Sequence, residues 1–184
     1  LIFWDPLFDE KFASYARPQL LVKAGPIILI AIGLSIGFKA GIWNIGAEGQ
    51  YILGAIFGAT VALSVYPQES VFIFPAMILA GALGGFIWAL IPALLKVYFK
   101  TNDILVSLML VYVAENILAS VSQGLLRNPE GMGLPGSRNL KDYPSAHNSE
   151  LIVNSGMHWG VLTAFLALIL AYFLFLKHKK GYEI

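Results

Sequence analysis

Apolar residues along the chain gather into five long runs, each separated from the next by a polar segment. A helix of about 20 apolar residues crosses the hydrocarbon core of a bilayer. The pattern therefore predicts an all-α fold, a polytopic transmembrane helix bundle in which residues 1–184 form part of a single transmembrane domain. The predicted spans are about 19–38, 43–66, 71–95, 104–126 and 159–176, with the polar loop 127–157 before the last one.

The second span depends on a polar stretch that precedes its apolar run. The run itself, 51–66, has 16 residues and is short for a membrane crossing. It reaches the length of a span only if part of the stretch 41–50 also lies at membrane depth. Three glycines and three polar side chains of this stretch are the candidate functional residues: Gly41, Gly46, Gly49, Asn44, Glu48 and Gln50.

These glycines indicate a helix that is interrupted at membrane depth. Non-helical backbone at that depth is tolerated only where it is buried in protein or lines a watery cavity. We therefore predict that the three polar side chains line a solute pathway. On a helix, Asn44 and Glu48, four residues apart, would share one face. The alternative is a structural role, in which Glu48 holds a neighbouring helix end through hydrogen bonds.

Glu115 is a second acidic residue within an apolar run, and Asn116 follows it. A carboxylate near the bilayer centre costs about 2.5–3.5 kcal/mol on insertion scales, so we expect Glu115 to face the bundle interior or a cavity. It is therefore a second candidate pathway residue. An interhelical hydrogen bond is the equally open alternative.

Lysine positions orient the predicted spans. Lys96 and Lys100 lie between the third and fourth spans, and three lysines lie at 177–180, whereas the turn 67–70 has no Lys or Arg. Cytoplasmic loops carry an excess of Lys and Arg. We therefore expect the connection after the third span and the end of the fifth to be cytoplasmic. The loop 127–157 and the N-terminal segment are then external.

Two further patterns predict local structure. Thr101, Asn102 and Asp103 are good helix N-cap types directly before the fourth span. Small residues four apart lie on one helix face, where they allow helix backbones to approach closely in lipid. The pairs Gly54/Gly58 and Gly81/Gly85 therefore predict tight packing within one bundle.

Composition supports a membrane protein and gives no sign of catalysis. The chain is 58% apolar and 12% charged, with a mean hydropathy of +0.73. A net charge of +1 does not suit a protein that binds nucleic acid by neutralising phosphates. The sequence has no cysteine, no phosphate-binding loop and no histidine pair at metal-ligand spacing. Serines within the runs, including Ser107, are expected to bond their own helix backbone. We expect no catalytic residue, metal or cofactor.

Two motifs resemble those of one permease group. The stretch G-I-W-N-I-G-A-E-G-Q at 41–50 is similar to the F-N-I-G-A-E-G-Q signature of the membrane subunits of ABC importers for nucleosides and simple sugars. The stretch T-N-D-I-L-V-S-L-M-L-V-Y-V-A at 101–114 resembles the second signature of that group. Trp43, Asp103 and Val111 stand where the group more often has Phe, Glu and Asn.

The resemblance implies a permease subunit that forms the translocation path of an ATP-driven importer in the plasma membrane of a prokaryote. ATP hydrolysis would then take place on separate cytoplasmic ATPase subunits. A solute-binding protein would lie outside, and a second permease subunit, identical or related, would complete the pore. The solute would be a nucleoside or a simple sugar. The expected permease is roughly twice this length, and we interpret the chain as an internal fragment of it.

Two other functions remain open at this point. An ion-coupled secondary transporter would also need intramembrane acids, and Glu48 with Glu115 would serve. A structural membrane subunit is the third possibility, and it predicts that substitutions within 44–50 harm assembly rather than transport alone. The dependence of uptake on ATP or on a proton gradient distinguishes the two transporters.

Overall fold

The computed structural model describes residues 8, 10–132, 136–151 and 155–177. The chain divides into two compact units. The central unit is the continuous stretch Ile42–His147, and the terminal unit joins Leu1–Gly41 to Asn148–Ile184. Each unit therefore has its own packing.

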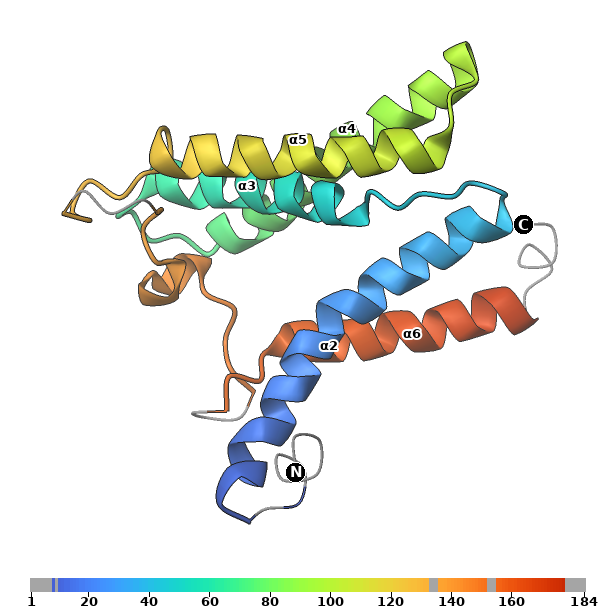
Figure 1. Cartoon of the computed structure of the whole chain (residues 1–184). Coiled ribbons are helices and arrows are strands. Elements are labelled where there is room, and N and C mark those ends of the chain that lie inside the picture. Colours follow the sequence, from blue (N-terminus) through green and yellow to red (C-terminus); the bar gives the residue numbers. More distant parts are fainter. Residues whose placement is uncertain (1–7, 9, 133–135, 152–154, 178–184) are drawn as a thin grey trace. The chain divides into compact units, whose positions relative to one another are not determined.

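The described residues confirm the all-α class, with five apolar helices long enough to cross a membrane. No strand occurs among them, and only two isolated β-bridges are present. Two short 3₁₀ helices lie in the loop before the last helix. The elements are α2 (Glu10–Lys39), α3 (Ala47–Val65), α4 (Ile73–Phe99), α5 (Asp103–Gln123), η1 (Leu140–Asp142), η2 (Pro144–Ala146) and α6 (Trp159–Lys177) (Figure 1).

Two helix starts differ from the sequence-based expectation. The first helix already includes Glu10, within the charged segment that precedes the apolar run, because hydropathy marks where a chain enters lipid and not where its helix begins. The second begins at Ala47 rather than near 43, so residues 42–46 are not helical. That stretch forms the start of the central unit.

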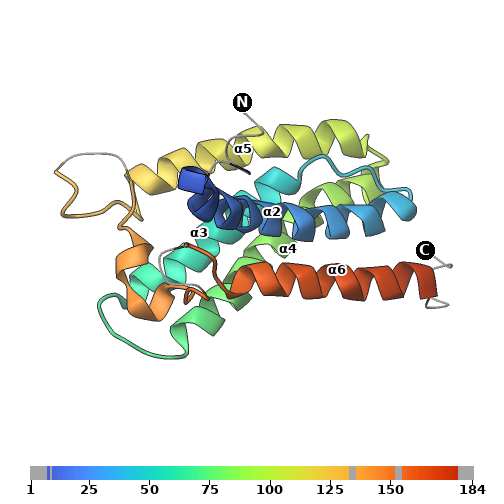
Figure 2. The same cartoon turned by 90° about the horizontal axis from the view of Figure 1, so that it is seen from below.

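Helices α2 and α6 of the terminal unit pack against each other and run in the same direction (Figure 2). The Gln19 side chain donates to the Ser155 carbonyl, 3.1 Å away, just before α6 begins. At the other end, the Lys39 ammonium lies 4.9 Å from the centre of the Phe175 ring. The early part of α2 therefore lies beside the early part of α6, and the two C-terminal ends also meet.

Glycines bring α3 and α4 of the central unit into close contact, as their spacing predicts. A Cβ atom added to Gly54 would lie 3.0 Å from the Gly81 carbonyl oxygen, and one added to Gly81 would lie 3.1 Å from the Gly54 oxygen. A Cβ on Gly85 would lie 3.2 Å from the backbone carbonyl oxygen of Gln50. Larger residues at these positions would separate the two backbones.

The two ends of the central unit are built from different segments. The turn between α3 and α4 and the loop that carries η1 and η2 lie at one end, and residues 42–46 and the α4–α5 connection lie at the other (Figure 1). Between them, Leu53, Ile56 and Ala114 form a buried apolar cluster that joins α3 to α5. The helices and this cluster therefore separate the two ends of the central unit from each other.

Candidate functional site

The non-helical segment 42–46 obtains its hydrogen bonds from side chains. The Trp43 N–H donates to Asp103 Oδ2 at 3.0 Å, and the Ile45 N–H donates to Ser107 Oγ at 3.1 Å. The Gly46 N–H donates to Oδ1 of Asn44 at 2.8 Å. Since unpaired backbone groups are costly away from water, these acceptors allow the chain to leave the helix here.

The spacing of the two α5 acceptors matches the spacing of the two donors. Asp103 and Ser107 are four residues apart on a helix, which is a rise of about 6 Å. Trp43 and Ile45 are two residues apart in non-helical chain, and two residues span about 6.6 Å when fully extended. One face of α5 can therefore bind alternate N–H groups of the segment. Ser107 also donates to the Ile104 carbonyl at 3.2 Å, so it keeps the bond to its own helix that its type predicts.

An ion pair joins the end of α4 to the start of α5. The Lys96 ammonium lies 2.6 Å from Oδ2 of Asp103, the same oxygen that accepts from Trp43. Asn102 is the actual N-cap, because its side chain accepts from the N–H groups of Ile104 and Leu105. Asp103 is therefore not needed as the cap and is available to hold two other segments.

Two of the predicted glycines lie where a side chain would meet neighbouring atoms. A Cβ on Gly46 would lie 2.8 Å from the Ser107 carbonyl oxygen, and one on Gly49 would lie 3.0 Å from the Trp88 indole nitrogen. Gly41 has a positive φ of 75°, a conformation that favours glycine, just after α2 ends. Gly46 and Gly49 thus allow α3 to begin close against α5.

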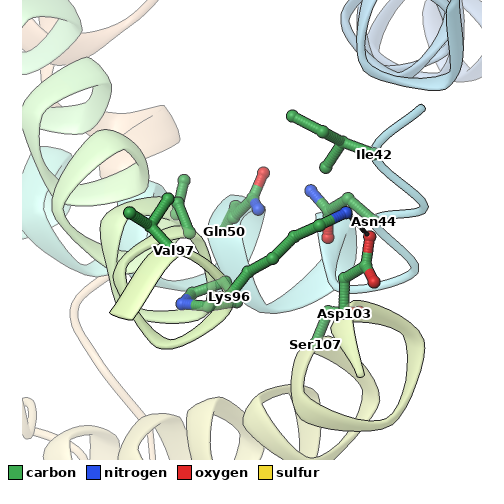
Figure 3. A pocket seen from close by; sticks show the side chains of 10 residues that line it. Ile42, Asn44, Gln50, Lys96, Val97, Asp103 and Ser107 are labelled. Carbon is green, nitrogen blue, oxygen red and sulfur yellow. Dashed lines mark hydrogen bonds and ion pairs between the residues drawn. The ribbon is translucent and has the colours of Figure 1, made fainter. Parts of the chain in front are cut away.

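These elements surround a pocket of about 460 Å³ within the central unit (Figure 3). Its wall includes both amides of the predicted stretch and the three side chains just described. The lining residues are Ile42, Asn44, Gln50, Ala89, Pro92, Ala93, Lys96, Val97, Asp103 and Ser107. The volume lies within the range of small-molecule sites. A mainly apolar wall with a few polar groups is also typical of such sites.

The structure separates the four predicted pathway residues into two sets. Asn44 and Gln50 line the pocket, and the Gln50 amide makes no hydrogen bond to any described residue. Glu48 and Glu115 are exposed within the central unit and do not line it. The expected shared face of Asn44 and Glu48 is wrong, because the helix begins at Ala47 and Asn44 precedes it.

Sequence reasoning does not single out Lys96, Asp103 or Ser107 as part of this site. Lys96 marks the orientation of the spans, Asp103 belongs to a capping motif, and Ser107 is one of several serines in apolar runs. Their four-residue and seven-residue spacing near a helix start is the one available signal. It becomes informative only once the segment 42–46 is known to lie against α5.

The opposite end of the central unit is held by aromatic rings, and we call Tyr66, Arg138 and Tyr143 the aromatic end. Tyr143 is only 2% exposed, lies edge-on to Tyr66 with ring centres 5.2 Å apart, and donates its hydroxyl hydrogen bond to the Gln68 carbonyl. The Arg138 guanidinium stacks 4.2 Å from the centre of the Tyr66 ring. It also pairs with Glu130 at 3.2 Å.

Burial and charge perturb two groups at the aromatic end. Burial raises the pKa of the Tyr143 hydroxyl, and the negative charge of Glu69 and the neighbouring Tyr66 raise it further. The hydrogen bond that the Arg138 guanidinium donates to the Glu130 carboxylate raises the pKa of Arg138. Both side chains therefore keep their ordinary protonation states over the neutral range.

A family model described as "Branched-chain amino acid transport system / permease component" matches residues 18–184. A glucose ABC transporter permease protein of Haloferax volcanii is 33% identical, over 97% of this chain and 49% of the relative. A guanosine ABC transporter permease protein of Bacillus subtilis is 26% identical, over 98% of this chain and 51% of the relative. A nucleoside ABC transporter permease protein of Lactococcus lactis is 28% identical, with the same two coverages.

The chain thus spans about half the length of the curated relatives that it matches. No solved structure matches it.

Proposed function

The chain belongs to this family of transport-system permease components, and from that premise we propose that it forms part of the translocation path of an ATP-driven importer for a nucleoside or a simple sugar. The family match and the names of the relatives confirm the resemblance found in the motifs at 41–50 and 101–114. Five helices of span length in a permease family make the chain a multi-pass membrane protein, and its named relatives come from prokaryotes.

The observation that carries the proposal is the pocket next to the first motif. Gln50 presents an amide with no hydrogen bond to any described residue, and Asn44 lies across from it (Figure 3). An amide both donates and accepts, as do the hydroxyl groups of a sugar or a ribose. We assign Gln50 and Asn44 to solute contact. The chemistry of the site is binding and release, and ATP hydrolysis takes place on other subunits.

The proposed assembly contains cytoplasmic ATPase subunits, an external solute-binding protein and a second permease subunit. The Lys96 end of the central unit faces the cytoplasm in this proposal, and the aromatic end faces outward toward the solute-binding protein. Because α2 and α6 run in the same direction, both then run from outside to inside. The lysines at the ends of both helices, Lys39 and Lys177, agree with it.

Glu48 and Glu115 have another place in this proposal. Both are exposed within the central unit, and a carboxylate that faced lipid would be unfavourable. We infer that other helices of the assembled permease cover them. They then border the wider pathway or hydrogen-bond across helices, the two alternatives that the sequence leaves open.

Uptake by the full-length permease in its assembled transporter, reconstituted in vesicles with internal ATP, tests the function. Replacing Gln50 by alanine is expected to lower kcat/KM for the transported solute about tenfold, the effect of one lost hydrogen bond of about 1.4 kcal/mol. Asn116→Ala is the matched control, because Asn116 is exposed and bonds the Tyr112 carbonyl of its own helix. Equal uptake by both variants would remove Gln50 from the path.

The same vesicles distinguish the two classes of transporter. Uptake that requires ATP and survives dissipation of the proton gradient supports the importer. Uptake that persists without ATP and stops when the gradient is dissipated would replace the proposal with a secondary transporter.

A further inference from the structure

The pocket contains one positive and one negative side chain, and they are bound to each other. Among the described residues that line it, Lys96 and Asp103 are the only charged ones, and their ion pair measures 2.6 Å. The other polar lining groups are the neutral side chains of Asn44, Gln50 and Ser107. The pocket therefore carries both signs of charge and no net charge.

This arrangement treats solutes differently according to their charge. A neutral solute can bind the amides and leave the ion pair intact. An anion can bind Lys96 only in competition with Asp103, which stays nearby and repels it. A cation can bind Asp103 only in competition with Lys96, which stays nearby and repels it. Charges near a protein surface interact more strongly than charges in bulk water, so a charged solute is disfavoured by the member of the pair that has its own sign.

We propose that Lys96 and Asp103 form a charge filter that restricts this pocket to uncharged polar solutes. The inference rests on the proposed function, since it treats the pocket as part of the solute path. The apolar wall formed by Ala89, Pro92, Ala93 and Val97 suits the face of a ring, and the amides suit its hydroxyl or amide groups. The selected class is a neutral ring compound that carries hydrogen-bonding groups.

Asp103 and Lys96 also have a structural role, and the experiment must separate it from the filter. Oδ2 of Asp103 accepts from the Trp43 N–H, and an asparagine retains an oxygen for that bond. Methionine approximates the apolar stem of Lys96 without its charge. The variants Asp103→Asn and Lys96→Met therefore break the same ion pair and leave opposite net charges in the pocket. The double variant leaves none.

The measurement is equilibrium binding to the full-length permease in complex with its ATPase subunits, without the solute-binding protein. The probes are uridine, uridine 5′-monophosphate and 5′-amino-5′-deoxyuridine, which are neutral, anionic and cationic; glucose, glucose 6-phosphate and glucosamine form the equivalent sugar set. Asp103→Asn is expected to raise the affinity for the anion relative to the neutral probe about tenfold, or about 1.4 kcal/mol. Lys96→Met is expected to raise that for the cation by a similar factor.

The double variant is expected to return both ratios toward the original values. Lys141→Met serves as the control for a charge change outside the pocket, since Lys141 is exposed in η1. If both single variants weaken all three probes alike, the ion pair is structural and the filter is wrong, while the transport function stands. If the unaltered assembly neither binds nor transports either neutral probe, the proposed function fails, and the filter fails with it.

Discussion

The two ends of the central unit are held together by different kinds of interaction. Both must fix chain that is not part of a membrane-spanning helix. At the end near Lys96, Asp103 and Ser107 hold the N–H groups of a non-helical segment with charged and hydroxyl oxygens. At the aromatic end, two edge-on tyrosine rings and a guanidinium hold the loop against the turn between α3 and α4.

The two ends differ in how much of their interior the side chains fill. Tyr143 and Ala146 close the aromatic end by packing against Ala62 and Ile73, and all four are buried. The other end encloses a pocket of about 460 Å³ instead. Short polar side chains fix a backbone by its hydrogen-bonding groups and leave room beside it, whereas rings fix a loop by occupying the room. The first arrangement suits a solute path, and the second suits a rigid platform.

The largest effect is expected at the aromatic end, from Tyr143→Ala. Removal of a buried aromatic side chain typically destabilises a protein by about 3–5 kcal/mol. Tyr143→Phe keeps the ring and loses only the bond to the Gln68 carbonyl, so about 1 kcal/mol is expected. Thermal unfolding of the purified permease in detergent measures both. Equal losses would show that the hydroxyl, and not ring packing, holds the loop.

A smaller loss is expected at the other end, from Gly46→Ala. The new methyl group would lie 2.8 Å from the Ser107 carbonyl oxygen, which is backbone and cannot turn away. Overpacking of this kind costs about 1–3 kcal/mol. Gly33→Ala is the control, because nothing lies within 4 Å of its added Cβ. The same unfolding assay is expected to show a loss only for Gly46→Ala, and an unchanged midpoint would contradict the close approach of α3 to α5.

The hydroxyl that fixes the segment is tested by Ser107→Ala. The Ile45 N–H then loses its acceptor, which costs about 1–3 kcal/mol if no water replaces it and less if pocket water does. Hydrogen exchange at the Ile45 amide is expected to accelerate. Ser122→Ala is the control, since Ser122 is half-buried and bonds the Ala119 carbonyl of its own helix. Unchanged protection at Ile45 would show that the segment does not depend on α5.

The smallest effect is a pH dependence confined to the aromatic end. The folded pKa of Tyr143 is raised above its unfolded value of about 10. Its contribution to stability is therefore complete below that value and is lost as pH rises through the folded pKa. A spectroscopic tyrosinate titration is expected to lose a late-titrating component in Tyr143→Phe. A titration curve that loses an early component instead would refute the burial of this hydroxyl.

Sequence patterns predict the helices of this protein better than its site. Hydropathy identifies all five spans, and the spacing of Gly54 and Gly81 predicts a close helix contact, because both properties are local to one helix. The motif at 41–50 contains Asn44 and Gln50, which line the pocket, and also Glu48, which does not. The partners of that segment could not be found, because Asp103 lies 60 residues from Trp43 and Ser107 lies 62 from Ile45.

The position at which α3 begins explains why Asn44 and Glu48 do not share a helix face. A periodic pattern assigns Asn44 and Glu48 to one face only if the helix already includes both. Gly46 and the side-chain acceptors of α5 delay the start of α3 to Ala47, so the two side chains diverge. Tertiary hydrogen bonds decide this boundary, and no local pattern contains them.

The parallel course of α2 and α6 also imposes a rule of parity. Two helices that run in the same direction across a bilayer must be separated by an odd number of crossings. Helices α3, α4 and α5 are all long enough to cross, including α3, whose first turn is preceded by non-helical chain, and three full crossings satisfy the rule. A re-entrant α3 that returned to its own surface would invert α6. The side-by-side packing of α2 and α6 therefore requires an odd number of crossings among the three helices between them.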